Sequence, residues 1–436
     1  MKETMNPLSD ERQKLLSDLQ RDAFKYFVNE VNPDNGLVVD CTKEGWPSSI
    51  AAVGMALSVY PIGVERGLIT RAEASARTLK NLRFFARSEQ STSPDATGYK
   101  GFYYHFLDMQ TGRRAWQCEL STIDTTFLLA GMLAAAAYFD RDTAEEDEIR
   151  KLADELYRRV DWKWAIDGGG ATLTHGWMPE TGFLAYRWER YDESTLAYVL
   201  GLGSPTFPLA VESCQAHASS YEWKKIYNYE YLYAAPLFTH QFSHIWIDFR
   251  EIKDAFMREH DLDYFENSRR ATYAQQEYAK RNPNEFKGYS EVCWGLTACE
   301  GPGPKELTIE GARRLFFDYV ARGVPDGPDD GTVAPWAVVA SLPFAPEIVL
   351  PTLEHFNEIE IGVDHPYGLE ATFNPTYPDE QSRGRGWLSP WHYGINEGPI
   401  VLMIENHLSG FLWELMRECP YIVDGLRRAG FTGGWL

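Results

Sequence analysis

Apolar residues recur at spacings of three and four along most of this chain. In Glu11–Glu30 they are Leu15, Leu16, Leu19, Phe24 and Phe27, which places them on one face of an amphipathic helix. Proline and glycine between such runs mark turns. The pattern predicts further helices, arranged as six consecutive hairpins: Ser48–Tyr60 with Arg71–Arg87, Ser121–Phe139 with Ala144–Val160, Asp192–Gly201 with Pro208–Lys225, Asp248–Glu259 with Tyr264–Arg281, Thr332–Ser341 with Pro346–Phe356, and Glu397–Arg417 with Pro420–Ala429.

Strands are expected only as short pieces within loops, near Gly36–Cys41, Ala171–Trp177 and Gly182–Tyr186. The sequence has no regular alternation of strand and helix and no phosphate-binding glycine loop, which argues against a nucleotide-binding fold. Paired helices indicate an all-α fold class. No linker or low-complexity tract divides the 436 residues, so we expect one large domain over 1–436.

The composition narrows the possible partners. A net charge of −21 disfavours binding to nucleic acid or to anionic membranes. The N-terminus has no apolar core of a signal peptide and no stretch approaches a membrane span of about 20 apolar residues, so we expect a cytoplasmic protein, or a periplasmic one if a signal was removed. The six cysteines show no metal-binding spacing and are expected to be reduced thiols.

The segment Gly176–Leu209 carries the clearest chemical signal. It gathers aromatic residues around four carboxylates, Glu180, Glu189, Asp192 and Glu193, and an apolar helical run follows at once. Aromatic faces bind the apolar faces of sugar rings, and pairs of carboxylates cleave glycosidic bonds. This combination favours a carbohydrate-active enzyme. The stacking candidates here and in other loops are Trp177, Trp188, Tyr191, Trp294 and Trp391.

Glycoside hydrolysis needs an acid to protonate the leaving oxygen and a second carboxylate. Glu193 is the candidate acid, because it joins the aromatic loop to a rigid apolar helix; the alternative is that Asp192 caps this helix and Glu193 only complements its dipole. Asp124 lies in an S-x-x-D capping box but also on an apolar helical stripe, where a carboxylate is costly without a partner or a task. Glu119, just before that helix, is a further candidate.

Several blocks resemble one family. The run GWMPETGF…YDE…LGSPT, the segment Tyr104–Gly131 (YHFLDMQTGRRAWQCELSTIDTTFLLAG) and later blocks are similar to motifs of the glycoamylase-like glycoside hydrolases, the family that contains bacterial β-1,2-glucanases. The later blocks are Ser243–Arg250, Asp263–Ser268, Cys293–Ala298, Asp329–Glu347 and Gly394–Met416. They occur in family order from about Gly36 to the C-terminus.

The resemblance implies an (α/α)6 barrel, with six helical hairpins in two concentric rings. It aligns Glu193 with the glutamate of the family's Y-N-E motif, where this chain has Asp192 in place of asparagine. It also places Asn396 where the family more often has aspartate, so a catalytic role there is absent or has moved to Glu397. Other residues in matched blocks are candidates for binding sugar hydroxyls: Asp40, His105, Asp248, Arg250, Glu291 and Asn396 itself. Asp192 is a candidate for the helix cap or for a substrate ligand.

The resemblance further implies hydrolysis of a neutral β-linked glucan, most of all β-1,2-glucan or sophoro-oligosaccharides. Glu193 would be the general acid, and Asp124, Glu119 or Glu397 would activate water. Two alternatives stay open: an exo-acting glucosidase, disaccharide-releasing enzyme or transglycosylase on the same linkage, and a non-catalytic glucan-binding protein on the same fold. The number of subunits is left open.

No cofactor or metal is expected. The pair His240 and His244 has helical spacing but lies outside an H-E-x-x-H motif, and Asp326–Gly331 lacks the spacing of an EF-hand loop. The sequence therefore predicts metal-independent acid–base catalysis.

Overall fold

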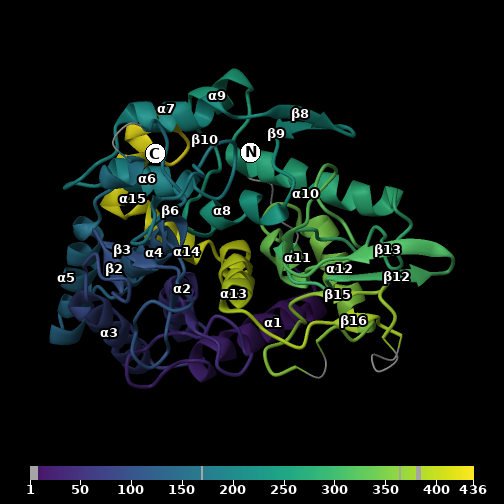
Figure 1. The fold of residues 1–436 in the computed structure, drawn as a ribbon, viewed down its shortest axis with the longest axis horizontal. Coiled ribbons are helices and arrows are strands. Elements are labelled where there is room, and N and C mark those ends of the chain that lie inside the picture. The colour runs from purple at the N-terminus through teal and green to yellow at the C-terminus, as the bar shows by residue number, and fades with distance from the viewer. Residues whose placement is uncertain (1–7, 168–169, 363–364, 380–383) are drawn as a thin grey trace.

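The computed structural model describes residues 8–167, 170–362, 365–379 and 384–436. Helices dominate this part of the chain (Figure 1), as the hydrophobic pattern predicts. The α-helices are α1 Asp10–Asn29, α2 Ile50–Glu65, α3 Arg71–Arg87, α4 Thr122–Tyr138, α5 Ala144–Arg159, α6 Thr195–Gly203, α7 Val211–Ser219, α8 Phe242–Trp246, α9 Ala255–Glu259, α10 Tyr264–Arg281, α11 Pro335–Ala340, α12 Pro346–Glu358, α13 Gly394–Leu408, α14 Phe411–Arg417 and α15 Pro420–Arg428.

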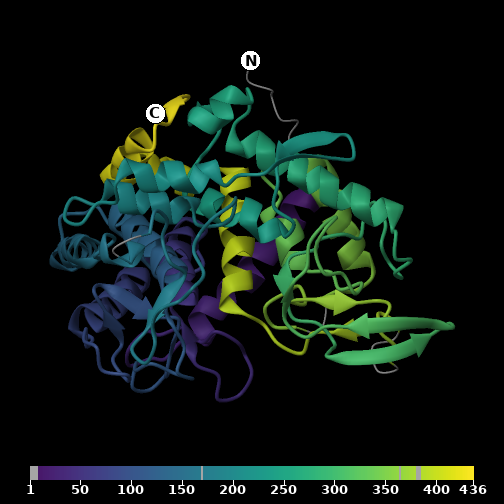
Figure 2. The same cartoon turned by 45° about the horizontal axis from the view of Figure 1, so that its top comes forward.

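The helices are of two kinds. In α2, α4, α6 and α13 nearly every residue is buried, and in α6 every residue is. Such helices must lie inside the protein, because an all-apolar surface cannot face water. By contrast, α1, α3, α5 and α10 bury one face and expose charged residues on the other. Both views show α13 near the middle of the molecule (Figures 1 and 2).

The interior helices pack directly on one another. The helix α2 contacts α4 and α13, while α4 also contacts α6, and α13 also contacts α11. Glycines allow the closest approach: a Cβ on Gly131 of α4 would lie 2.1 Å from the carbonyl oxygen of Gly54 on α2. A side chain at either glycine would therefore force these two helices apart.

Strands are short and lie in the loops. A five-stranded sheet, in the order β2-β3-β5-β6-β7, joins several of these loops through antiparallel pairs. The strands are β1 Ser48–Ser49, β2 Gly98–Tyr99, β3 Phe102–Tyr104, β4 Phe106–Leu107, β5 Leu120–Ser121, β6 Gly176–Met178, β7 Gly182–Phe183, β8 Trp223–Ile226, β9 Tyr229–Leu232, β10 Ile252–Lys253, β11 Ala298–Cys299, β12 Lys305–Ile309, β13 Ala312–Phe316, β14 Val320–Ala321, β15 Phe373–Asn374, β16 Trp387–Leu388 and β17 Thr432–Gly433.

Three predicted helices differ from the structure. The predicted helix Glu397–Arg417 is divided into α13 and α14, because Gly410 takes a left-handed backbone with φ of 72°. Pro208–Lys225 contains α7 but ends in strand β8, and Asp248–Glu259 contains β10 before the short α9. The strand-rich segment β11–β14, whose hairpin β12–β13 projects at the edge of the molecule in Figure 1, was not expected from the sequence.

Near Gly36–Cys41 the structure has isolated bridges, such as Val39 with Ser48, in place of a regular strand. Across the described ranges, each helix is too short or too polar to cross a lipid bilayer.

Candidate functional site

The pairing of β3 with β5 brings two predicted residues to one place. Tyr104 lies opposite Leu120 in this antiparallel pair, so His105 after β3 lies beside Glu119 before β5. The backbone N–H of His105 donates to the backbone carbonyl oxygen of Glu119 at 3.0 Å. Asp124 follows in the first turn of α4, which begins directly after β5. Residues 105, 119 and 124 therefore meet where the sheet joins an interior helix.

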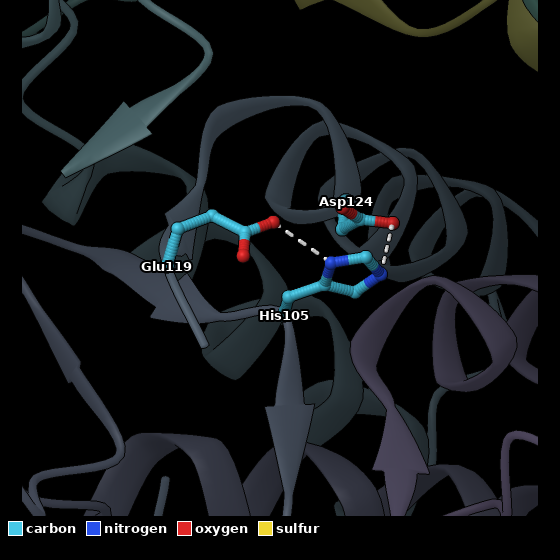
Figure 3. A group of neighbouring side chains, drawn as sticks. All are labelled: His105, Glu119 and Asp124. Atoms are coloured by element: carbon cyan, nitrogen blue, oxygen red, sulfur yellow. Dashed lines mark hydrogen bonds and ion pairs between the residues drawn. The ribbon is translucent and has the colours of Figure 1, made fainter. Parts of the chain in front are cut away.

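His105 bridges the two carboxylates (Figure 3). Its Nδ1 lies 2.8 Å from Oε1 of Glu119, and its Nε2 lies 3.7 Å from Oδ1 of Asp124. Burial lowers the pKa of His105, but the charges of Asp124, Glu119 and Asp40 outweigh it and raise that pKa to about 9. The ring also stacks on Phe106 at a centroid distance of 3.9 Å. His105 is therefore an imidazolium at neutral pH, held between carboxylates.

Asp124 contacts both the cap of α4 and His105. Its backbone N–H donates to Oγ of Ser121 at 3.1 Å, and that hydroxyl donates to Oδ2 of Asp124 at 2.5 Å. The residue is 5% exposed. Burial raises the pKa of Asp124, which His105 and the Ser121 hydrogen bond only partly offset. Ser121 thus caps α4, and Asp124 is bonded to this cap and also faces His105.

Glu119 differs from Asp124 in its ionisation. Burial raises the pKa of Glu119, but the hydrogen bond and charge of His105 outweigh burial, so its pKa lies below the ordinary value. The side chain is 31% exposed. Glu119 is therefore an ionised carboxylate that water can reach.

Glu193 stands just before α6, two residues ahead of the helix. Its carbonyl oxygen accepts a hydrogen bond from Ser243 at 2.9 Å, and the Ser243 hydroxyl also accepts the N–H of Leu196 at 3.1 Å. Burial raises the pKa of Glu193 well above the ordinary value, and the charges of Asp192 and Asp124 add to the rise. Glu193 is only partly buried, so it combines a raised pKa with access to solvent.

Asp192 caps the turn before α6. Its Oδ1 accepts the N–H of Ser194 at 2.9 Å and the Ser194 hydroxyl at 2.5 Å. Burial raises the pKa of Asp192 to about 7. Asp192 therefore stabilises this turn through Ser194, and Glu193 has no part in these two hydrogen bonds.

Asp40 approaches the same place from the segment after α1. Its Oδ2 accepts the indole N–H of Trp46 at 3.1 Å. Burial raises the pKa of Asp40 to about 6; His105 opposes this rise and Asp124 adds to it. We call Asp40, Glu119, Asp124 and Glu193, together with His105, the carboxylate cluster. Its members act electrostatically on one another although they are far apart in the sequence.

Glu397 lies in a different setting. It is 1% exposed in the first turn of α13, and Oε1 lies 2.8 Å from Nδ1 of His392. Nε2 of His392 lies 2.5 Å from His365, whose other nitrogen lies 2.8 Å from Glu370. Burial raises the pKa of Glu397, which His392 and His365 oppose. Glu397 thus stands at one end of a series of contacts that continues through His392 and His365 to Glu370. The contact with His392 occupies one of the two carboxylate oxygens of Glu397.

Asn396, in the same turn, is 7% exposed. Its amide cannot accept a proton as the family's aspartate can.

The aromatic candidates fall into two groups. Trp294 is fully buried and donates its indole N–H to Thr352, and Trp188, 7% exposed, stacks on His175. Tyr191 is buried against Tyr264. The prediction that these three rings bind sugar by stacking does not fit the structure, because their faces are covered. Trp177 and Trp391 are partly exposed, and Trp177 packs on Tyr99 and Trp164.

Three other candidates lie outside the carboxylate cluster. Asp248 is buried and is paired with Arg250 and Arg417, and its carbonyl accepts the indole N–H of Trp435 near the C-terminus. Asp248 and Arg250 thus form a structural ion pair. Glu291 is exposed, and only its backbone carbonyl is engaged, by Gln276.

Tyr319 lies near the carboxylate cluster and was not among the candidates from the sequence. It is 69% exposed in the loop between β13 and β14. Desolvation by the surrounding protein raises the pKa of its phenol, and the charges of Cys299, Asp40, Glu193 and Asp124 add to the rise. The ring is thus open to solvent and close to the carboxylate cluster. No local motif marks it, since its position depends on the fold of a distant loop.

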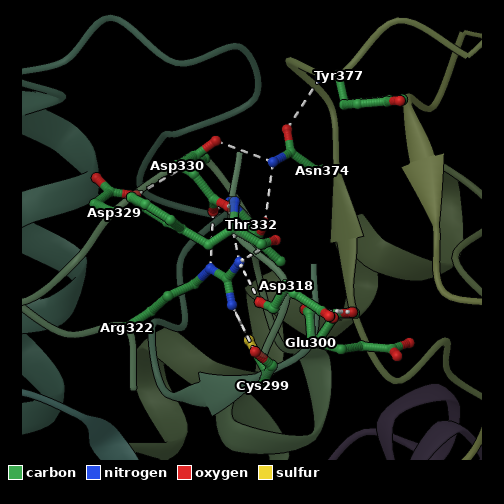
Figure 4. Close-up of polar contacts among 12 residues, drawn as sticks. Cys299, Glu300, Asp318, Arg322, Asp329, Asp330, Thr332, Asn374 and Tyr377 are labelled. Carbon is green, nitrogen blue, oxygen red and sulfur yellow. Dashed lines mark hydrogen bonds and ion pairs between the residues drawn. The ribbon is translucent and has the colours of Figure 1, made fainter. Parts of the chain in front are cut away.

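The buried Arg322 holds that loop. It donates to the carbonyl oxygens of Phe317 and Asp318, each at 3.2 Å, and pairs with Asp330 at 2.7 Å (Figure 4). Glu300 lies near Asp318 in this view, and its carboxylate accepts the Tyr393 hydroxyl at 2.5 Å. Burial raises the pKa of Glu300.

The chain is 26% identical over 98% of its length to the exo β-1,2-glucooligosaccharide sophorohydrolase (non-reducing end) of Parabacteroides distasonis, and it spans 58% of the length of that relative. It is 28% identical to a protein of Bacteroides uniformis described as a "putative glucoamylase", with a TM-score of 0.85 over 99% of this chain and 100% of the other.

The endo-β-1,2-glucanase of Chitinophaga pinensis, solved with sophorotriose and glucose, has the same fold, with a TM-score of 0.83, 24% identity, and coverage of 99% of this chain and 100% of the other. Residues 185–420 match the glycoamylase family, described as "Putative glucoamylase". This match extends over more than half of the chain, and we conclude that the chain belongs to the glycoamylase family.

Proposed function

We propose that this protein is a glycoside hydrolase that cleaves β-1,2-linked glucan or sophoro-oligosaccharides. The observation that carries the proposal is Glu193, a partly exposed carboxyl group whose pKa is raised by burial and by neighbouring carboxylates. A general acid needs this property to hold its proton near neutral pH. The names of the Parabacteroides and Chitinophaga relatives support the β-1,2 linkage.

The carboxylate cluster supplies two carboxyl groups with pKa values moved in opposite directions. Glu193 is raised and Glu119 is lowered, which is the separation expected of an acid and a base in one site. In this proposal Glu193 protonates the leaving oxygen, and Glu119 or Asp124 accepts a proton from the attacking water. Glu397 is the weaker candidate, because it is buried and bonded to His392.

The fold supports a finer proposal. The interior contacts of α2 with α4, α4 with α6, and α13 with both α2 and α11 follow the order expected of an inner ring of helices. We infer that residues 1–436 form one (α/α)6 barrel, with the carboxylate cluster at the end of the ring where α4 and α6 begin. The helix N-termini there supply partial positive charge to an acidic site.

A panel of linkage-defined glucans tests the function. Sophoro-oligosaccharides and β-1,2-glucan should be hydrolysed, and β-1,3-, β-1,4- and α-1,4-glucans should not. The product profile separates release of sophorose from chain ends, as the Parabacteroides relative is named, from internal cleavage. Cleavage of α-1,4-glucan without activity on β-1,2-linked material would refute the substrate assignment. Binding of β-1,2-glucan without turnover would indicate a non-catalytic protein.

A further inference from the structure

Trp116 is unusually placed for a tryptophan. Its side chain is 55% exposed, whereas large aromatic residues in this protein are mostly buried. Its φ is 55°, and the next residue, Gln117, has a φ of 51°. Two consecutive residues with side chains in the left-handed region are strained, and such strain concentrates at functional sites.

A buried arginine maintains this turn. The side chain of Arg114 is 1% exposed and pairs with Glu180 at 2.7 Å. Its Nε donates to the carbonyl oxygen of Cys118 at 2.6 Å, and its Nη2 donates to that of Gln117 at 2.8 Å. These bonds fix the carbonyl groups just after Trp116. The strained turn is therefore held firmly, and it presents an indole ring to solvent.

The exposed ring adjoins the carboxylate cluster on two sides. On one side Trp116 contacts Phe106 at a centroid distance of 5.1 Å, and Phe106 stacks on His105. On the other side it meets Trp46 edge-on at 4.8 Å, and Trp46 donates its indole N–H to Asp40. A row of aromatic rings thus borders the cluster from His105 to Asp40.

We propose that Trp116, supported by Trp46, forms a sugar-binding subsite that stacks against one glucosyl unit of the substrate next to the unit cleaved at Glu193. Trp116 supplies the stacking face. Lys43 lies over one face of the Trp46 ring, with Nζ 4.7 Å from the ring centroid. Because that face is covered, Trp46 supports Trp116 and does not itself stack on the sugar. The apolar faces of glucose match an exposed indole. The subsite rests on the proposed function, since it names where a further unit of the same substrate binds.

Chain-length kinetics test the subsite. Trp116→Ala should lower kcat/KM about tenfold for sophoro-oligosaccharides long enough to reach the ring, and should leave the shortest cleaved oligosaccharide unchanged. Trp116→Phe should restore most of the loss. Phe207→Ala is the matched control, since Phe207 is an aromatic residue 40% exposed in the loop after α6, and it should change nothing. An equal loss at every length, or no loss at any length, would overturn the subsite.

A binding measurement separates failure of the subsite from failure of the proposed function. Tryptophan fluorescence of Glu193→Gln is titrated with sophorose through sophoropentaose, with and without Trp116→Ala. If the wild type hydrolyses the substrate but binding does not depend on Trp116, the proposed subsite is refuted and the proposed function stands. If Trp116→Ala weakens binding about tenfold but the wild type does not hydrolyse the substrate, Trp116 binds sugar and the proposed hydrolase function is refuted. Absence of binding overturns both.

Discussion

Two clusters of charged groups in the described part of this protein are built on opposite principles. In the carboxylate cluster, three acids, Asp40, Glu119 and Asp124, act on the single histidine His105, and Asp124 also acts on Glu193. Around Arg322, one guanidinium meets one carboxylate, Asp330, and both side chains are fully buried. The carboxylate cluster is partly exposed, and the pKa values of several of its members are shifted from their ordinary values. The Arg322–Asp330 pair is closed to solvent.

The difference separates a chemical site from a structural one. Arg322 also donates to the carbonyls of Cys299, Phe317 and Asp318, and Asp330 also accepts the N–H groups of Phe317 and Thr332. Removing one partner of such a buried pair leaves the other charge uncompensated, which destabilises the folded protein. The carboxylate cluster instead leaves its acids unevenly neutralised, and displaced pKa values of this kind are typical of active sites.

The largest expected effect is at Glu193. Glu193→Gln keeps the shape of the side chain but cannot deliver a proton, so turnover should fall by at least about a hundredfold while substrate binding is largely kept. Initial rates on sophoro-oligosaccharides, with binding followed separately, measure both quantities. The variant and the wild type are compared at matched thermal stability.

The control is Asp192→Asn, which retains the oxygen that accepts from Ser194 and should keep most of the turnover. Near-normal turnover in Glu193→Gln would reduce Glu193 to a residue that complements the dipole of α6, and would leave Glu119 and Asp124 as the candidate acids.

Changes to the buried pair Arg322 and Asp330 should lower the stability of the protein and should not affect its catalytic chemistry. Arg322→Met leaves Asp330 as an uncompensated buried charge, which typically costs roughly 3–5 kcal/mol of unfolding free energy. Adding Asp330→Asn should recover part of the loss. Denaturant unfolding measures both variants.

The exposed pair Arg313 and Glu306 on the β12–β13 hairpin is the control, because Arg313→Ala should leave stability unchanged. If Arg322→Met were as stable as the wild type, Asp330 would have to be protonated or hydrated in the folded protein, and the contrast between the clusters would fail.

His105 links the carboxylate cluster to the pH dependence of stability. Its folded pKa of about 9 exceeds the ordinary value, so its stabilising contribution is fully present below about pH 6.5 and is lost as pH rises to about 9. The wild type should therefore exceed His105→Gln in stability by up to about 3 kcal/mol at pH 6, and the difference should shrink toward pH 9–10.

Unfolding curves across this range, with His355→Gln as control, measure the effect. Among the residues that the structure describes, one carboxylate, Glu358 at 3.9 Å, is paired with His355. A difference between the wild type and His105→Gln that does not change with pH would show that His105 is not an imidazolium in the folded protein.

Asp192 offers a smaller and more specific test. Its charge is the largest single charge that raises the pKa of Glu193. Asp192→Asn should lower that pKa, so the alkaline limb of kcat/KM should move to lower pH, on the order of one pH unit. Full pH–rate profiles measure the shift. Asp154→Asn on α5, paired with Arg158, is the control. A limb that stays in place would mean that another group sets it.

Local patterns were enough to predict where two helices of the candidate site begin. The capping box Ser121–Asp124 and the apolar run of α6 marked where two interior helices begin, and helix starts fixed Asp124 and Glu193. The predominance of helix is likewise confirmed, because amphipathic spacing is a local signal. These predictions needed only residues within one or two turns of each other.

Contacts between distant segments could not be predicted in the same way. The meeting of His105 with Glu119 depends on the register of β3 and β5, and the burial of Glu397 depends on His392 and on His365 beyond it. Trp116 lies within a motif block and Tyr319 outside any, and for both exposed rings only the folded chain shows which groups lie nearby. Pairing between loops follows from tertiary packing, which a pattern of single residues does not encode.

The smallest expected effect is that of a chelator. His105, Glu119 and Asp124 offer three possible ligand atoms within 4.8 Å of one another, so a metal is the main competing explanation for this cluster. Yet both ring nitrogens of His105 face carboxylates, and a pKa of about 9 keeps both protonated at neutral pH. A metal ligand must offer a lone pair. Dialysis against EDTA should therefore leave the rate and the thermal midpoint unchanged. Loss of activity that zinc or calcium restores would show that His105, Glu119 and Asp124 bind a metal, and the contrast drawn with Arg322 would then be wrong.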